Sequence, residues 1–408
     1  MKRRTFLSGM ACSQGTGHSR FLKGVGSMEK MRRLFSARCA PVWICLLLVA
    51  FLLLLPTGFE DKEIFQESDI RPAKVLATDE SAVVDTGLIR SGEQSCQVEI
   101  LGGPFRGQRA EGKNLLNGSL EQDKLFSVGD TALVRINHAG GAILSVSMID
   151  HYRLPWELVM AGLFVLLLVG FAGWTGLRAV LSFVVTVLCI WKVLVPLYLR
   201  GWDPIAVGLI LAAALTVLII ALVYGFDRRC AAAVSGSLLG LLVTCLLGAF
   251  FTRAFQIHGA VMSYSESLLY AGYQHLDLTR IFMASIFIGA SGAVMDLSVD
   301  ITSAVYELAE KRPDLPRWEA VKSGMNIGRA AMGTMTTTLL LAYSGGYVAL
   351  LMVFMAQGTP MSNIFNYKYV AAELVHTVIG SFGLVTVAPF TALCAGLLLP
   401  FARTERAL

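Results

Sequence analysis

Apolar stretches long enough to cross a membrane alternate with short polar connections over most of this chain. A helix needs about 20 mostly apolar residues to cross a hydrocarbon core of about 30 Å. The apolar stretch Val42–Pro56, extended by its flank to Phe59, predicts one such helix near the start, and the pattern from residue 154 onward predicts seven more. We therefore expect an all-α membrane bundle of about eight transmembrane helices. The seven later spans are Leu158–Trp174, Ala179–Leu199, Ile205–Tyr224, Ala231–Phe251, Ile281–Thr302, Ala330–Ala356 and Glu373–Phe401.

One large polar block, residues 60–153, separates the first expected helix from the others. It contains short runs of strand-forming residues separated by Gly, Asp, Asn and Pro, a pattern typical of a small all-β domain. We expect a β-rich barrel or sandwich, in which the turn-rich residues 102–114 form either an ordinary connecting loop or a ligand-binding loop. The expected strands are Ala73–Thr78, Cys96–Leu101, Ala132–Asn137 and Ala142–Met148.

Composition agrees with a multi-pass membrane protein and excludes nucleic-acid binding. Hydrophobic residues make up 55% of the 408 residues and charged residues 15%, whereas soluble domains average about 25% charged residues. The net charge of +5 is modest, and the basic residues stand beside apolar stretches instead of forming a patch of their own. The partner that this composition indicates is the lipid bilayer.

The basic residues also predict the orientation in the membrane. Arg178, Lys311 and Arg403 fall on the same expected side as the Lys- and Arg-rich N-terminus, and such residues favour the cytoplasmic side. We expect both termini in the cytoplasm and the β-rich domain outside it. The domain order is then a basic cytoplasmic segment at 1–41, a transmembrane signal anchor at 42–59, an extracytoplasmic β-rich domain at 60–153, a membrane domain at 154–402 and a cytoplasmic tail at 403–408.

The sequence lacks the motifs that would indicate an enzyme or a metal site. Its eight cysteines form no CxxC pair or Cys/His cluster, so neither zinc nor a disulfide framework is indicated. HExxH and the phosphate-binding GxxxxGK[ST] are absent, and GxSxG has no plausible triad. We expect no catalytic residues, no metal and no cofactor.

Asp296 is the residue that most needs an explanation. The charge-free stretch before it, Ile281–Met295, covers only about 22 Å of helix, so crossing a core of about 30 Å places Asp296 within the membrane. An ionised Asp at the centre of a transmembrane helix costs about 3 kcal/mol. It therefore needs a partner, water or a proton.

Spacings of three and four place this aspartate on a helix face with small and acidic residues. We expect the small residues to allow a neighbouring helix to pack closely, as Gly333 would in the next span, and the acids to face protein or a water-filled cavity. The alternative is that the later acids lie on a part of the helix that protrudes into the cytoplasm. The members of this face are Ser285, Gly289, Gly292, Asp296, Asp300, Ser303 and Glu307.

Hydroxyl groups in the next span, Thr336 and Thr337, are expected either to face the Asp296 stripe across a polar cavity or only to support helix packing. Lys192 and Arg329 are the expected counter-charges, although Lys192 has the alternative of extending toward the membrane surface. The candidate ligands for a solute or ion are Asp296, Asp300, Ser303, Thr336 and Thr337.

Residues 314–329 combine helix-start signals with Trp318, Val321, Met325 and Ile327 among charges. We expect an amphipathic helix in the membrane plane, which either anchors the chain or contacts a cytoplasmic partner or a second copy of the chain.

Two stretches resemble the YibE/F family of bacterial membrane proteins: GASGAVMDLSVDITSAVYEL at Gly289–Leu308, and SGMNIGRAAMGTMTTTLLLAYSGG at Ser323–Gly346. CQVEILGGPFRGQ and FSVGD extend the likeness into the polar block. The chain departs from the family pattern at Thr337, where Asn is expected. The resemblance implies a multi-pass protein of the bacterial cytoplasmic membrane, described as a permease, and it implies no substrate.

Two functions fit these observations. The first is a transporter for a small solute or ion that uses the intramembrane acids, as ion-coupled carriers do. The second is a non-transporting scaffold or sensor, whose outer domain binds a ligand or partner.

Overall fold

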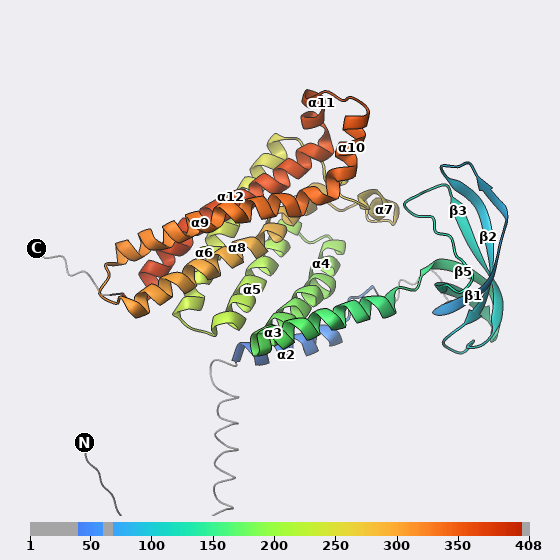
Figure 1. Cartoon of the computed structure of the whole chain (residues 1–408), viewed down its shortest axis with the longest axis horizontal. Helices are drawn as coiled ribbons and strands as arrows, with labels where there is room; N and C mark the ends of the chain where they lie inside the picture. Colours follow the sequence, from blue (N-terminus) through green and yellow to red (C-terminus); the bar gives the residue numbers. More distant parts are fainter. Residues whose placement is uncertain (1–39, 60–67, 402–408) are drawn as a thin grey trace, which may run out of the picture. The chain divides into compact units, whose positions relative to one another are not determined.

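The computed structural model describes residues 40–59 and 68–401 (Figure 1). The described residues form two compact units, one within residues 58–176 and the other from residues 40–57 together with 177–401. Most of the expected basic segment 1–41 and the whole tail 403–408 lie outside the described residues.

The smaller unit contains a closed β-barrel with the strand order β1-β2-β3-β5-β4. Neighbouring strands are antiparallel except for the parallel pair β3 and β5. A five-stranded Greek-key barrel of this order is an OB-fold, so of the two expected forms the barrel is confirmed. The strands are β1 (Ser68–Asp85), β2 (Arg90–Ile100), β3 (Arg109–Asn117), β4 (Thr131–Ala139) and β5 (Ala142–His151).

Strand β3 includes residues 109–114 of the stretch 102–114 that the sequence assigned to a loop, so the loop assignment holds for residues 102–108 and is wrong for the rest. The reason lies in its inward positions, which are Gly112, Asn114 and Leu116 instead of a run of large apolar residues. A Cβ at Gly112 would lie 2.7 Å from the Met148 sulfur. Only glycine therefore fits there without a shift of Met148.

The barrel interior combines apolar side chains with a closed network of amides. Asn114 Nδ2 donates to Gln94 Oε1 at 3.1 Å and to the Lys124 carbonyl at 2.6 Å. Gln94 bonds both the N–H and the carbonyl of Phe126. Desolvation, reinforced by Glu80, raises the pKa of the buried Cys96 thiol to about 11, so this thiol is an inert part of the core.

The described residues contain six helices long and apolar enough to cross a membrane, and a shorter apolar helix, α2 (Ala40–Leu54). One of the six, Leu154–Leu199, includes two of the expected spans, Leu158–Trp174 and Ala179–Leu199. It consists of α3 (Leu154–Cys189), the π-helical turn η1 (Ile190–Leu194) and α4 (Val195–Leu199). Its backbone leaves helical geometry at Gly173, where φ is 55°.

The other five spans follow the expected order. They are α5 (Pro204–Tyr224), α6 (Arg228–Ala254), α8 (Leu278–Lys311), α9 (Arg317–Ser344) continued by η3 (Gly345–Tyr347) and α10 (Val348–Ala356), and α12 (Lys368–Leu398). Short elements connect them: η2 (Gly259–Val261) and α7 (Ser265–Tyr270) precede α8, and α11 (Met361–Asn366) precedes α12.

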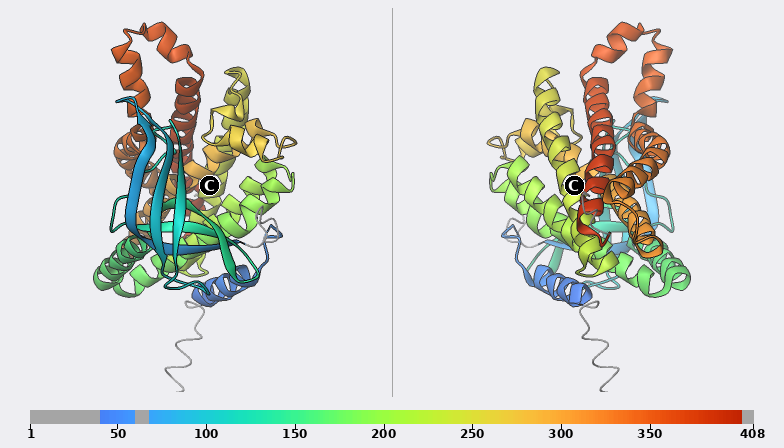
Figure 2. Two further views of the ribbon diagram at one scale, coloured as in Figure 1. Left: turned by 90° about the vertical axis from the view of Figure 1, so that its right-hand side faces the viewer. Right: turned by 90° about the vertical axis from the view of Figure 1, so that its left-hand side faces the viewer.

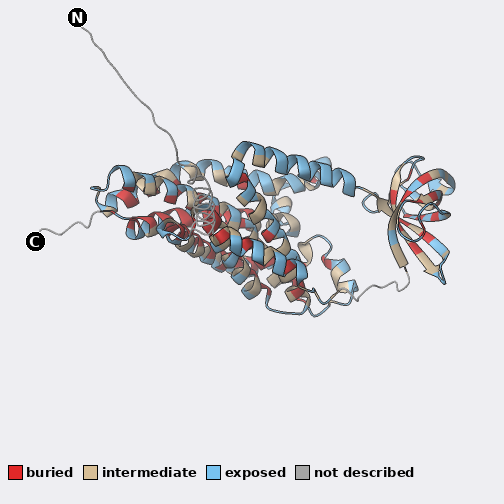
Figure 3. Cartoon of the chain, turned by 90° about the horizontal axis from the view of Figure 1, so that it is seen from below, coloured by how far each residue is buried: buried red, intermediate tan, exposed pale blue. Residues whose placement is uncertain are grey.

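Helix α8 lies against α5, α6, α9 and α12, and the right-hand view of Figure 2 shows α12 running beside α9. Small residues bring α6 and α12 together, since a Cβ at Gly236 would lie 2.2 Å from Thr391 Oγ1. Close approach of this kind is how transmembrane helices gain van der Waals contact. Figure 3 shows the buried residues gathered between the packed helices and inside the barrel.

Residues 314–329 do not form the separate helix that the sequence suggested. Most of them form the beginning of α9, where Gly324 and Gly328 pack against α8 and α12. A Cβ at Gly328 would lie 2.8 Å from the Ala388 Cβ and 3.0 Å from Ile301 Cδ1. The glycines therefore allow this segment to pack in the bundle. The charged residues around them suggested a helix at the membrane surface instead.

Candidate functional site

One side of α8 is buried within the bundle, and the other side is largely exposed and has only a few contacts. Ile286, Ala290, Leu297 and Ile301 are buried on the packed side. The expected small and acidic residues lie on the other side, where the following are exposed at the surface of the chain: Gly289, Gly292, Asp296, Asp300, Ser303 and Glu307. We refer to these six residues as the polar face of α8.

Neither expected counter-charge meets the acids of the polar face. Lys192 Nζ donates to the Leu55 carbonyl just after α2, at 3.0 Å, and Arg329 Nη1 donates to Asn326 Oδ1 at 3.3 Å. Asp296 and Asp300 have no ion pair or hydrogen-bond partner among residues 40–59 and 68–401. They lie one helical turn apart, so their like charges repel. An ionised pair within a membrane requires water, a cation or a proton to offset its cost.

The hydroxyl groups proposed as ligands are bonded to their own helices or to a neighbour. Thr336 Oγ1 donates to the Met332 carbonyl at 2.8 Å, and Thr337 Oγ1 to the Gly333 carbonyl at 3.3 Å. Such bonds leave each oxygen able to accept. Neither threonine is hydrogen-bonded to Asp296 in the described part of the chain.

Ser303 ties the polar face to α5. The Tyr224 hydroxyl donates to the Val299 carbonyl at 2.7 Å and lies 2.6 Å from Ser303 Oγ. Tyr224 has only one hydroxyl proton, so Ser303 donates to it. Ser285 Oγ similarly donates within α8, to the Phe282 carbonyl at 2.8 Å.

Of the three glycines expected to pack between helices, Gly289 has the closest neighbours. A Cβ there would lie 2.7 Å from the Tyr343 hydroxyl and 3.3 Å from His376 Cε1. A Cβ at Gly292 or Gly333 would meet nothing within 4 Å. Packing at these two glycines stays a prediction, and it requires a partner outside the described residues.

Tyr343 and His376 belong to a cluster that sequence reasoning missed. Their ring centroids lie 4.4 Å apart and the rings are nearly perpendicular. Glu373, one turn before His376, accepts hydrogen bonds from Thr377 and Tyr347. The signal for this cluster in the sequence is the Glu-x-x-His spacing at the start of an apolar stretch. Because the expected span begins at Glu373, the sequence places this acid at the membrane boundary and not in a site.

The cluster and the acids lie along one continuous path on α8. The cluster contacts Gly289, and Gly292, Asp296, Asp300, Ser303 and Glu307 follow at helical spacing. From Gly289 to Glu307 the helix rises by about 27 Å, close to the thickness of a hydrocarbon core. The polar face is thus nearly as long as a hydrocarbon core is thick.

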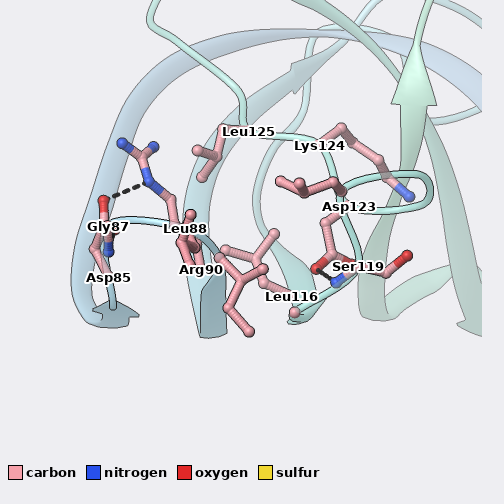
Figure 4. Close-up of a pocket in the computed structure, with 12 residues that line it drawn as sticks. Asp85, Gly87, Leu88, Arg90, Leu116, Ser119, Asp123, Lys124 and Leu125 are labelled. Carbon is pink, nitrogen blue, oxygen red and sulfur yellow. Dashed lines mark hydrogen bonds and ion pairs between the residues drawn. The ribbon is translucent and has the colours of Figure 1, made fainter. Parts of the chain in front are cut away.

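The barrel contains a second candidate site, a pocket of about 290 Å³ between the β1–β2 turn and the loop after β3 (Figure 4). Asp85 accepts from Gly87 N and Arg90 Nε, each at 2.8 Å, and Asp123 accepts from Asn117 N and Ser119 N. These bonds hold the pKa of both carboxyls below the usual value, the Gly87 and Asn117 N–H groups contributing most. The remaining lining is mainly apolar: Leu88, Ile89, Leu116, Leu120 and Leu125.

A bundle of apolar helices with an acidic face defines a multi-pass membrane protein. The chain belongs to the YibE/F-like protein family, whose model matches residues 160–400. This confirms the resemblance over the membrane unit, while the barrel strands lie outside the matched range. No curated protein and no solved structure matches this chain.

Proposed function

We propose that this protein is a carrier for a small solute or ion, coupled to a proton or cation that binds at Asp296. The observation that carries the proposal is the polar face of α8, where Asp296 and Asp300 have no partner in the described part of the chain. Acids placed in this way in membrane bundles commonly mark ion pathways.

The energetics oppose a purely structural role for these acids. An ionised Asp in acyl chains costs about 3 kcal/mol, and a second acid one turn away adds repulsion. A water-filled pathway, a bound cation or a proton would each remove this cost. At Gly292, one turn before Asp296, a Cβ would have no neighbour within 4 Å, which leaves room for an ion or water to approach the carboxylate from that side.

The orientation follows the distribution of basic residues. We propose that the protein lies in the bacterial cytoplasmic membrane with both termini in the cytoplasm and the barrel outside. This orientation requires an even number of crossings. Leu154–Leu199 has 46 residues, about 69 Å if helical throughout, and is interrupted at Gly173, so in this proposal it crosses twice, while α2 and the other five spans cross once each. In that orientation Asp300 and Glu307 lie toward the cytoplasmic end of α8, and the Glu373 cluster lies toward the outer end.

The test is uptake and efflux in sealed vesicles, with a broad panel of ions and metabolites, comparing wild type, Asp296→Asn and Glu307→Gln. Glu307 is a matched control because it lies on the same face but pairs with Lys311 at 2.6 Å. We expect Asp296→Asn to abolish coupled transport and Glu307→Gln to retain most of it. Wild-type transport by a correctly inserted Asp296→Asn variant would contradict the proposal.

The barrel pocket favours a second candidate, a sensor or scaffold that binds a ligand outside the membrane. Its apolar lining and two bonded carboxylates form a small, preorganised site. In this alternative, α9 or its exposed Trp318 would report to a cytoplasmic partner or a second copy. A Leu120→Asp variant should then lose the ligand response while Asp296→Asn keeps it, the reverse of the result expected for a carrier.

A further inference from the structure

Three elements converge on Glu373 and His376. Both residues lie on α12, one turn apart, where side chains three residues apart have Cβ atoms about 5–6 Å from each other. Tyr343 comes from the end of α9 and Tyr347 from η3. Helix α8 contributes Ser285 and Gly289. The cluster therefore depends on helices that are far apart in the sequence.

The groups around Glu373 supply hydroxyl donors and no positive charge. Thr377 Oγ1 lies 3.3 Å from Glu373 Oε1, and the Tyr347 hydroxyl also bonds the carboxyl group. No Lys, Arg or His forms an ion pair with Glu373 in the described ranges. A carboxylate in a membrane bundle without a counter-charge needs a proton or a small cation.

His376 is oriented so that one ring nitrogen can take up a proton. Its imidazole hydrogen-bonds to the backbone of Ser285, and since the Ser285 N–H is used within α8, the ring donates to the carbonyl. The other ring nitrogen of the neutral imidazole is then an acceptor. The groups facing the ring are Tyr343 and Phe282, and neither carries a charge that would compete for the proton.

Gly289 brings this histidine to the polar face of α8. The His376 and Tyr343 side chains occupy the space that a side chain at Gly289 would fill. Asp296 lies seven residues further along α8, a rise of about 10 Å. This distance is short enough for a few water molecules to connect the two positions.

We propose that Glu373 and His376 form a second proton-binding site, which exchanges protons with Asp296 along the polar face of α8. A proton binds the Glu373 carboxylate to give the neutral acid, passes to the free nitrogen of His376 to give imidazolium, and leaves through water to the Asp296 carboxylate. Each step moves one proton and changes no other bond. The inference rests on the carrier function proposed above and identifies its coupling ion as a proton.

The experiment is infrared difference spectroscopy of the full-length protein in lipid during a pH titration, with protons as the only probe. Among the titrating carboxylic-acid bands we expect one that is absent in Glu373→Gln and another that is absent in Asp296→Asn, while Glu307→Gln retains these two bands. If Glu373→Gln fails to insert, Glu373→Asp keeps the carboxyl group and should shift its band. Two unchanged bands in Glu373→Gln, or an unchanged spectrum in Glu373→Asp, would overturn the proposal. A Glu373 band that responds to Na⁺ or K⁺ instead of pH would also overturn it.

The role of His376 has its own readout. After a pH jump, His376→Gln should keep both bands but slow proton exchange between them by about 100-fold, as removal of an acid–base group does. An unchanged rate would remove His376 from the relay. Failure of the carrier function appears as absent solute transport with titrating bands intact. Failure of the present inference appears as Asp296-dependent transport without a Glu373 band.

Discussion

Polar side chains have hydrogen-bond partners inside the barrel, whereas two acids on the polar face of α8 have none among the described residues. Inside the barrel, Gln94 and Asn114 are fully buried, yet each bonds the other and the backbone around it. On α8, Asp296 and Asp300 lack any such partner in the part of the chain that the structure describes. A satisfied polar network fixes a structure, whereas unsatisfied acids in a membrane bundle are costly and remain available for a ligand. In this chain, hydrogen-bond partners, more than burial, therefore distinguish the structural polar groups from the candidate functional ones.

The largest effect should come from breaking the satisfied network. Gln94→Leu leaves the Phe126 N–H and carbonyl and one Asn114 donor without their partner, and unsatisfied buried groups cost about 1–3 kcal/mol each. We expect the barrel to lose about 3 kcal/mol or more. Hydrogen exchange of peptides covering β2 and β3 measures this in the intact protein. Unchanged protection would mean that water replaces the amide.

The next largest effect should come from helix packing. Gly236 packs against another helix, whereas Gly292 has open space beside it. Gly236→Val forces a branched side chain onto Thr391, with a cost of about 1–3 kcal/mol. Gly292→Val has open space and should leave the melting temperature nearly unchanged. Thermal melting in detergent compares the two variants. Equal losses at both positions would indicate a partner on the polar face of α8, from another copy or another protein.

Asp296→Asn should have a smaller effect on stability and a large one on function. The neutral amide removes the cost of a charge without a partner, so the free energy of unfolding should stay the same or rise. Membrane abundance and thermal melting measure this, beside the vesicle assay. A destabilised variant would show that Asp296 has a structural partner in the assembled protein.

The barrel and the membrane unit differ in how far the sequence predicts them. Alternating apolar residues located four strands, but β3 was missed because its inward positions include Gly112 and Asn114. Hydropathy located the membrane segments, yet it does not report whether Leu154–Leu199 is continuous or where Gly173 interrupts its geometry. These features depend on backbone conformation and on contacts distant in sequence.

The candidate site also has one part that the sequence predicts and another that it does not. Helical periodicity alone places Asp296 and Asp300 with Gly289 and Gly292. It does not say which side of α8 packs, because both sides carry small residues, such as Ala284 and Ala290 on the buried one. The cluster at Glu373 draws on α8, α9 and α12, so only the packed structure brings it together.

The smallest effect should come from acid acting on the exposed carboxylates of the barrel loops. The N–H groups of Asn117 and then Ser119 hold the pKa of Asp123 below its usual value, so the unfolded chain binds a proton at Asp123 more readily than the folded barrel does. The stability that this group contributes is therefore complete above its unfolded pKa of about 4. It is lost as the pH falls through the lower folded value.

Hydrogen exchange of the loop after β3 should accordingly stay constant from neutral pH down to about pH 5 and accelerate below about pH 4, once corrected for the intrinsic exchange rate. Asp123→Ala should show weaker protection at neutral pH and a smaller further loss in acid. The polar face of α8 should not share this response, since no N–H or cation in the described chain holds Asp296 ionised. If wild type and Asp123→Ala lose the same amount of protection in acid, the loss belongs to another group, such as Asp85, whose pKa is lowered by hydrogen bonds from Gly87 and Arg90. An Asp85→Ala variant then separates the two carboxylates, because only the responsible one abolishes the acid step when it is removed.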